Sequence, residues 1–135
     1  MKLKFLTLPF FLFLLLSLMS CDNDDDNNNN ECIENYIAYV VSVNSVDSGT
    51  VNESINIEVK FGVSNGCGGF GKFIETKNGN TRTIEVEAKY TGCICTQNAP
   101  IITTNYKFIT NKAGNYELNF KSSPTEYITV NLIIN

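Results

Sequence analysis

Alternation of apolar and polar residues is the clearest pattern in this chain, and it predicts β-strands. Residues 54–63 read SINIEVKFGV, with an apolar side chain at every second position from Ile55 to Val63. Successive side chains of a strand point to opposite faces, so this segment is expected to bury one face and expose the other. Residues 81–91 repeat the pattern, with four side chains expected inside: Ile84, Val86, Ala88 and Tyr90.

A hairpin is expected next to the second of these strands. Asn78-Gly79 lies between residues 70–76 and 81–91, both of which are rich in β-branched and aromatic residues. Asn-Gly is the strongest short signal for a two-residue hairpin turn, because both residues tolerate a positive φ. The strands at 70–76 and 81–91 are therefore expected to pair antiparallel.

Further strands are predicted at 36–46, 102–109, 115–121 and 126–134, and no segment shows a sustained helical period. In the first of them one face is expected to hold four side chains: Ile37, Tyr39, Val41 and Val43. In residues 113–120, AGNYELNF, a glycine turn precedes Tyr116, Leu118 and Phe120, which are expected to point inward. This pattern is typical of the strand that carries a tyrosine corner. About seven short strands predict an all-β fold, a single immunoglobulin-like antiparallel β-sandwich spanning residues 32–135.

The N-terminus has the pattern of an export signal. Lys2 and Lys4 precede an apolar run from Phe5 to Leu18, which is shorter than the roughly 20 residues that a membrane-spanning helix needs. Leu18-Met19-Ser20-Cys21 follows directly and resembles the bacterial lipobox, in which the cysteine is lipidated and becomes the first residue of the mature chain. Residues 1–20 are therefore predicted to be a cleaved lipoprotein signal peptide, and Cys21 the site of a lipid anchor, palmitate included, in the bilayer.

Residues 21–31 are expected to be a disordered tether. The stretch from Asp22 to Glu31 contains no apolar residue, so it has no surface to bury in exchange for its conformational entropy. Its aspartates imitate the start of an EF-hand loop, but Asn27 occupies the position that requires glycine and Ile33 the position of the bidentate glutamate. Calcium binding is therefore not expected.

Charge and composition exclude several functions. Residues 1–20 hold two of the ten Lys and Arg and none of the fourteen Asp and Glu, so the chain from Cys21 onward has a formal charge of −6. Nucleic acid is not expected as a partner, because phosphate binding needs clustered cations. The chain has no histidine, and strand alternation places Glu85 and Glu87 together on the solvated face. No enzyme, cofactor or metal site is therefore expected.

Four cysteines remain for the exported domain: Cys32, Cys67, Cys93 and Cys95. In an exported protein they predict two disulfides rather than a zinc site or free thiolates, since there is no paired C-x₂-C framework. Cys93 and Cys95 are two positions apart near a strand end, where their side chains point in parallel, so a bridge between them would be strained. Each is expected to pair with Cys32 or Cys67, and both such pairings remain open.

The segments NGCGGFGKF and YTGCICTQ resemble small immunoglobulin-like surface lipoproteins of Bacteroidota. The resemblance implies the pairs Cys67–Cys95 and Cys32–Cys93. The acidic run behind Cys21 also resembles the surface-export signal of such lipoproteins. It implies an outer-membrane lipoprotein exposed at the cell surface, the alternative being one that faces the periplasm.

The expected function is therefore a membrane-anchored, non-enzymatic lipoprotein that displays its domain for binding at the cell envelope. An unknown protein or glycan would be bound by loops at one end, at residues 64–72 or 92–100, which offer Tyr, Phe and Asn side chains. Two alternatives are a proteinase inhibitor-like domain, since disulfide-pinned loops resist cleavage, and a structural subunit of an envelope complex.

Overall fold

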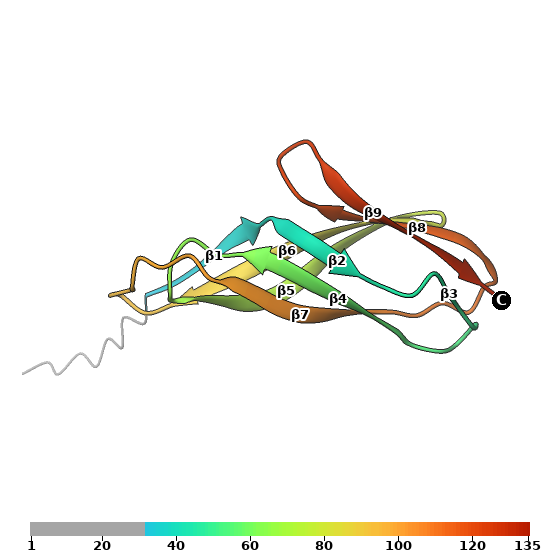
Figure 1. Ribbon diagram of the computed structural model, residues 1–135, viewed down its shortest axis with the longest axis horizontal. Helices are drawn as coiled ribbons and strands as arrows, with labels where there is room; N and C mark the ends of the chain where they lie inside the picture. The colour runs from blue at the N-terminus through green and yellow to red at the C-terminus, as the bar shows by residue number, and fades with distance from the viewer. Residues whose placement is uncertain (1–31) are drawn as a thin grey trace, which may run out of the picture.

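The computed structural model describes residues 32–135, which form an elongated β-sandwich without helices (Figure 1). The predicted signal peptide, lipidation site and tether lie outside the described residues. The part of the chain that is described contains no helix long and apolar enough to cross a membrane. The strands are β1 (Ile33–Ala38), β2 (Val40–Asn44), β3 (Ser48–Gly49), β4 (Ile55–Gly62), β5 (Gly68–Asn78), β6 (Thr81–Thr91), β7 (Ile101–Phe108), β8 (Gly114–Lys121) and β9 (Tyr127–Ile134).

The strands form a six-stranded and a three-stranded sheet, which confirms the predicted β-sandwich. In the larger sheet β6 pairs with β5 along one side, and with β1 and β8 along the two halves of its other side. β9 pairs with β8, and β3 with β9. The smaller sheet has the order β2-β4-β7. Two pairs, β6–β8 and β3–β9, are parallel, so the prediction of a purely antiparallel sandwich was wrong at these two places.

The core lies between the two sheets and follows the predicted alternation. Every inward position predicted for β4 and β6 is buried, from Ile55 to Val63 and from Ile84 to Tyr90. Within residues 32–135 no polar or charged residue is buried. The remaining buried side chains come from the other long strands and from the β1–β2 junction: Ala38, Val40, Tyr106, Phe108, Tyr116, Leu118, Phe120, Leu132 and Ile134.

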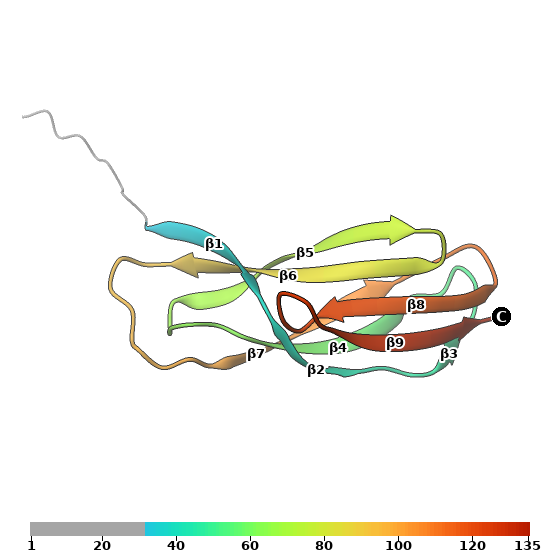
Figure 2. The same ribbon diagram turned by 90° about the horizontal axis from the view of Figure 1, so that it is seen from above.

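Residues 36–46 were predicted to be one strand with Ile37, Tyr39, Val41 and Val43 on the same face, and this prediction was wrong. This segment is two strands, because the chain leaves the larger sheet after Ala38 and joins the smaller one at Val40. Ala38 and Val40 are buried, whereas Tyr39 and Val41 are exposed. A bulge between Val40 and Ser42 then turns Val43 towards the core. The apolar residues at odd positions suggested the wrong face, and Figure 2 shows the crossing.

The predicted hairpin of β5 and β6 forms, but its turn lies one residue later than expected. Asn78 pairs with Thr81, so the two turn residues are Gly79 and Asn80. Gly79 has a φ of 60° and Asn80 has no positive φ. This places the glycine at the first turn position, as in a type II′ turn rather than the type I′ turn that Asn-Gly favours.

The inward side chains predicted for β8 are confirmed, and one of them makes the expected corner. The Tyr116 hydroxyl donates to the Lys112 carbonyl oxygen at 2.9 Å and lies 2.8 Å from Thr110 Oγ1. This bond back to the preceding loop is the tyrosine-corner arrangement.

A different set of loops lies at each end of the sandwich (Figures 1 and 2). We call the end that holds Cys32 and the segments 62–67 and 92–100 the loop end. We call the opposite end, with the 79–80 turn, segments 50–54 and 109–114 and Asn135, the far end. The described chain begins at the loop end and finishes at the far end, as Figures 1 and 2 show.

Candidate functional site

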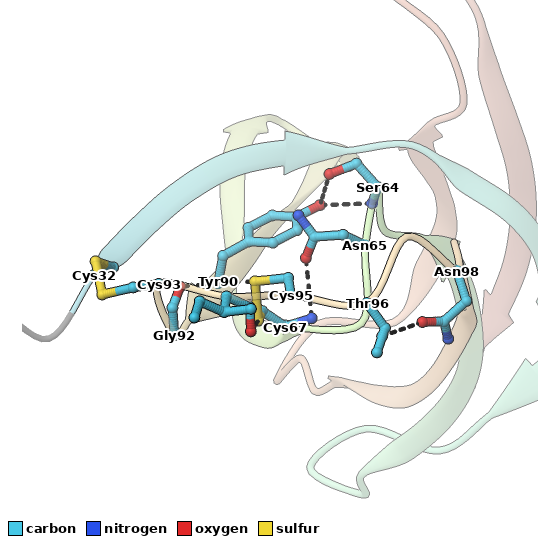
Figure 3. Close-up of a disulfide and its surroundings, with 11 residues drawn as sticks. Cys32, Ser64, Asn65, Cys67, Tyr90, Gly92, Cys93, Cys95, Thr96 and Asn98 are labelled. Atoms are coloured by element: carbon cyan, nitrogen blue, oxygen red, sulfur yellow. Dashed lines mark hydrogen bonds between the residues drawn. A yellow bond between two sulfur atoms is a disulfide. The ribbon is translucent and has the colours of Figure 1, made fainter.

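Both disulfides lie at the loop end, where they join three segments that are distant in sequence (Figure 3). Cys32 is bonded to Cys93 with a Cα–Cα distance of 5.0 Å, and Cys67 to Cys95 with 5.4 Å. These are the two pairs that the resemblance implied. Because these four sulfurs form two disulfides, none of them is a thiolate that could bind zinc or act as a nucleophile.

Backbone hydrogen bonds add to the covalent links between the two predicted ligand loops. The amide of Gly66 donates to the carbonyl of Thr96 at 2.9 Å, and the amide of Val63 to the carbonyl of Pro100 at 3.2 Å. Within the first loop, the Cys67 amide donates to the side-chain oxygen Asn65 Oδ1 at 3.0 Å. Segments 62–67 and 92–100 are therefore held as one rigid surface.

A groove opens beside this surface, between β1 and the end of β4, because β1 presents a polar inner face. Glu34 and Tyr36 pair with Tyr90 and Ala88, so they point to the same side of the sheet as the core residues of β6. A core-facing position in a sandwich is ordinarily apolar. Here the smaller sheet does not cover these positions, and the Tyr36 side chain remains 55% exposed.

The groove has two connected parts. The first has a volume of about 530 Å³ and is lined by Glu34, Tyr36, Ser64, Asn65 and Tyr90, together with half-cystines of both disulfides. The second has about 400 Å³ and continues along β1 to Tyr39. They share Tyr36, Ser64 and Tyr90, and we call them together the β1 groove.

Two tyrosine rings form a corner in the β1 groove. The rings of Tyr36 and Tyr90 are inclined at 70° with their centroids 5.7 Å apart. The Tyr90 hydroxyl accepts from the Ser64 amide at 2.9 Å and from the Ser64 hydroxyl at 3.2 Å, which fixes the inner ring. Gly68 permits this packing, because a Cβ there would lie 2.8 Å from Tyr90 Cε1 and 2.6 Å from Val63 Cβ.

The ring of Tyr36, the more exposed of the two, is oriented by the carboxylate of Glu34. The Tyr36 hydroxyl donates to Glu34 Oε2 at 2.7 Å. This hydrogen bond and then the negative charge of Glu34 raise the pKa of Tyr36 above its usual 10.0, so it remains an uncharged phenol at neutral pH. Glu34 is the one charged side chain among the residues that line the groove in the described chain.

A separate depression of about 450 Å³ lies at the far end, beside β8 and β9. Two of its polar side chains, Asn80 and Tyr116, already have partners inside the protein. Asn80 Nδ2 donates to the Asn115 carbonyl at 3.0 Å, and the Tyr116 hydroxyl is committed to its corner. We therefore take the β1 groove as the candidate site.

Other charged residues pair with each other outside the groove. Lys121 pairs with Glu85, and Lys72 Nζ lies 3.7 Å from Glu87 Oε1, so each of the two glutamates on the solvated face of β6 has a lysine of its own. Within residues 32–135 no group of three or more His, Cys, Asp or Glu is arranged to hold a metal ion.

The sequence located part of this site. It singled out the loops at 64–72 and 92–100 and all four cysteines, and the structure brings them together. Residues 68–72 belong to β5 rather than to the loop. It missed Glu34 and Tyr36, although they share the even-numbered phase with Ala38 and Val40, which could have revealed the inward face. Cys21 lies outside the described residues.

Comparison with known proteins finds a family but no individual relative. No curated protein and no solved structure matches the chain. The family model of the ORF11 beta-sandwich domain matches residues 57–130, which run from β4 into β9 and include three of the four half-cystines. Strand β1, which carries Glu34 and Tyr36, precedes the matched region. Since the match covers more than half of the sequence and describes the same all-β architecture, the chain belongs to the ORF11 beta-sandwich domain family.

Proposed function

We propose that the protein is a membrane-anchored, non-enzymatic lipoprotein that displays its β-sandwich for binding at the outer face of the cell envelope. The observation that carries this proposal is Leu18-Met19-Ser20-Cys21, which follows directly on the apolar run that ends at Leu18. The sandwich begins eleven residues after Cys21, at Cys32. Ten intervening residues reach at most about 35 Å, so the domain would stay close to the membrane.

The β1 groove supports a binding role for the displayed domain. It lies at the loop end, where the described chain begins, and its walls are fixed by two disulfides and by the Ser64–Tyr90 hydrogen bonds. Preorganised walls favour affinity because less conformational entropy is lost when a ligand binds. The absence of histidine from the sequence adds support to a non-enzymatic role.

Anchoring is tested by metabolic labelling with an alkyne fatty acid in a bacterium that processes lipoproteins. The wild-type chain is expected to incorporate the label, and Cys21→Ser to lose it and leave the membrane fraction. A matched control is Ser20→Ala, which keeps a small residue before the cysteine and is expected to remain labelled. Labelling of Cys21→Ser at the wild-type level would contradict the proposal.

Surface exposure is tested by adding a protease to intact cells. The domain is expected to be released by cleavage between residues 21 and 31, while a periplasmic marker remains intact. Protection of the domain until the cells are lysed would place it on the periplasmic side and direct the search towards periplasmic partners.

The proteinase-inhibitor alternative has one observation in its favour. Ile94 stands between two half-cystines and is 95% exposed, and cleavage after it would leave both pieces joined through Cys67–Cys95. Against it, the Ile94 carbonyl oxygen lies 3.7 Å from Cys67 Sγ, beside the loop's own disulfide. The inhibitor role predicts inhibition of an elastase-like serine protease that Ile94→Asp abolishes, whereas the binding role predicts no inhibition by either form.

A further inference from the structure

We propose that the β1 groove binds neutral carbohydrate, with the ring of one sugar unit packed on the exposed ring of Tyr36, beside Tyr90. This inference rests on the proposed binding function and specifies its ligand. The contents of the groove support it in three respects: the exposed aromatic surface, the hydrogen-bonding groups, and the charge.

The aromatic surface suits the apolar face of a sugar ring. A pyranose has C–H groups on its two faces and hydroxyl groups around its edge, so it packs by its face on an aromatic ring and keeps its hydroxyls free. Tyr36 is more than half exposed although it points to the core side of the sheet, so it supplies most of this surface. Tyr90 is buried and stands beside it at 70°. Tyrosine presents a large rigid surface for such a contact at low entropic cost.

The hydrogen-bonding groups around the corner suit hydroxyl groups. Glu34 accepts from Tyr36 through Oε2, and the same carboxylate carries a second acceptor, Oε1, on a residue that lines the groove. Asn65 accepts from the Cys67 amide through Oδ1, and its Nδ2 is the donor presented to the groove. An acceptor on one wall and a donor on the other match the paired hydroxyls of a sugar.

The charge of the groove argues against anionic ligands. No Lys or Arg lines either part of it, and Glu34 contributes a negative charge. A sulfated or uronic-acid polysaccharide would therefore be repelled. A lone ammonium group would satisfy Glu34, but it would leave most of the groove empty, since the two parts measure about 530 and 400 Å³. Volumes of this size are those of small-molecule sites, roughly 300–1,000 Å³.

The continuation of the groove to Tyr39 indicates more than one sugar subsite. A chain laid along β1 would place one unit at the Tyr36–Tyr90 corner and a neighbouring unit beside Tyr39. Oligosaccharides are therefore expected to bind more tightly than the corresponding monosaccharide.

The experiment uses the full-length chain, purified in a detergent without a sugar headgroup. Binding is measured by calorimetry against dextran, laminarin, yeast mannan and arabinoxylan, with dextran sulfate and poly-lysine as charged probes. At least one neutral polysaccharide is expected to bind, and dextran sulfate is expected not to bind.

Three variants locate the ligand. Tyr36→Ala is expected to weaken binding at least tenfold, Tyr36→Phe to retain most of it because the ring remains, and Glu34→Gln to weaken it several-fold. Tyr127→Ala is the matched control, because this tyrosine is similarly exposed but lies on β9 and lines neither part of the groove. Equal unfolding midpoints of Tyr36→Ala and Tyr127→Ala show that a loss of binding is local.

Two results would overturn the inference: no neutral polysaccharide binds, or Tyr36→Ala binds as tightly as the wild type. Binding of poly-lysine alone, lost in both Tyr36→Ala and Glu34→Gln, would assign the groove to a cationic ligand instead. That result would overturn the carbohydrate inference and leave the proposed binding function in place, because the groove would still be the binding site.

Discussion

The far end and the loop end of the sandwich are stabilised by different means. The far end is closed by apolar packing, including the fully buried Phe108 against Tyr116, whose ring centroids lie 5.1 Å apart. The loop end opens into a groove with Glu34 and Tyr36 on its wall, and it carries both disulfides. Cross-links act without a dense core, so they can hold an end that must leave polar groups accessible.

A polar cluster closes the edge of the sandwich where β5 and β7 face each other. Glu75 Oε1 is 2.7 Å from Arg82 Nη1, and the Tyr106 hydroxyl donates to Glu75 Oε2 at 2.6 Å. Arg82 also lies 4.6 Å from the centroid of the Phe108 ring. These contacts bridge the two sheets near the far end, so they belong to its packing rather than to the candidate site.

The largest effect is expected from removing a far-end core side chain. Phe108→Ala should lower the free energy of unfolding by about 3–5 kcal/mol, because it leaves a cavity beside Tyr116 and removes the ring under Arg82. Denaturant titration measures the loss. Tyr36→Ala, the corresponding truncation in the groove, should cost less than about 1 kcal/mol, since its ring is already largely exposed. Equal losses would remove the distinction between the two ends.

The next largest effect is expected from the disulfide that joins the two loops. Replacing Cys67 and Cys95 together by alanine should lower the free energy of unfolding by about 2–4 kcal/mol, by removing a covalent constraint from the unfolded chain. It should also increase hydrogen exchange at the amides of Gly66 and Val63, which donate to the other loop, while leaving the far-end strands protected. Uniform exchange across the molecule would show that the loop end is not stabilised separately.

A pH-dependent effect is expected at Glu75. Burial raises the pKa of its carboxyl, but the hydrogen bond from Tyr106 and the charges of Arg82 and Lys77 outweigh burial, so the pKa lies below 4.5. A carboxylate with a lowered folded-state pKa stabilises the fold above its unfolded pKa, and this contribution disappears as the pH falls through the folded value. Acid unfolding below about pH 4.5 should therefore be partly due to Glu75.

Glu75→Gln tests this assignment. It should cost about 1.5–3 kcal/mol at pH 7, as expected for hydrogen bonds to a charged group, and flatten the dependence of stability on pH below 4.5. The same change at Glu58, whose partner Lys60 is exposed, is the control and should cost almost nothing. If the stability of Glu75→Gln fell with pH below 4.5 as steeply as that of the wild type, Glu75 would not have this role.

The smallest effect is expected at the far-end turn. Gly79 has a φ of 60°, and a Cβ added there would meet no atom within 4 Å. Gly79→Ala should therefore cost about 1 kcal/mol through backbone strain alone. Thermal unfolding measures it, with Gly69→Ala as the control, since that position is equally open and has no positive φ. A neutral Gly79→Ala would show that the turn can relax.

The strands β4, β6 and β8 were predictable from the sequence because apolar and polar residues alternate along each of them and all the apolar residues lie on one buried face. The segment 36–46 was not, because its apolar residues at odd positions favoured the face that the structure exposes. The competing even-numbered phase became the inward one because the chain exchanges sheets between Ala38 and Val40, which depends on partners about fifty and twenty residues away.

The sequence by itself determined the all-β class, the alternating faces of most strands and the four cysteines of the domain, because these depend on the period of the side chains and on residue type. Tertiary structure alone decided that Glu34 and Tyr36 stand beside Tyr90, Ser64 and Asn65 in one groove. Groups drawn from β1, β6 and the loop after β4 meet only when the sheets have paired in register, and no local pattern in the chain encodes that meeting.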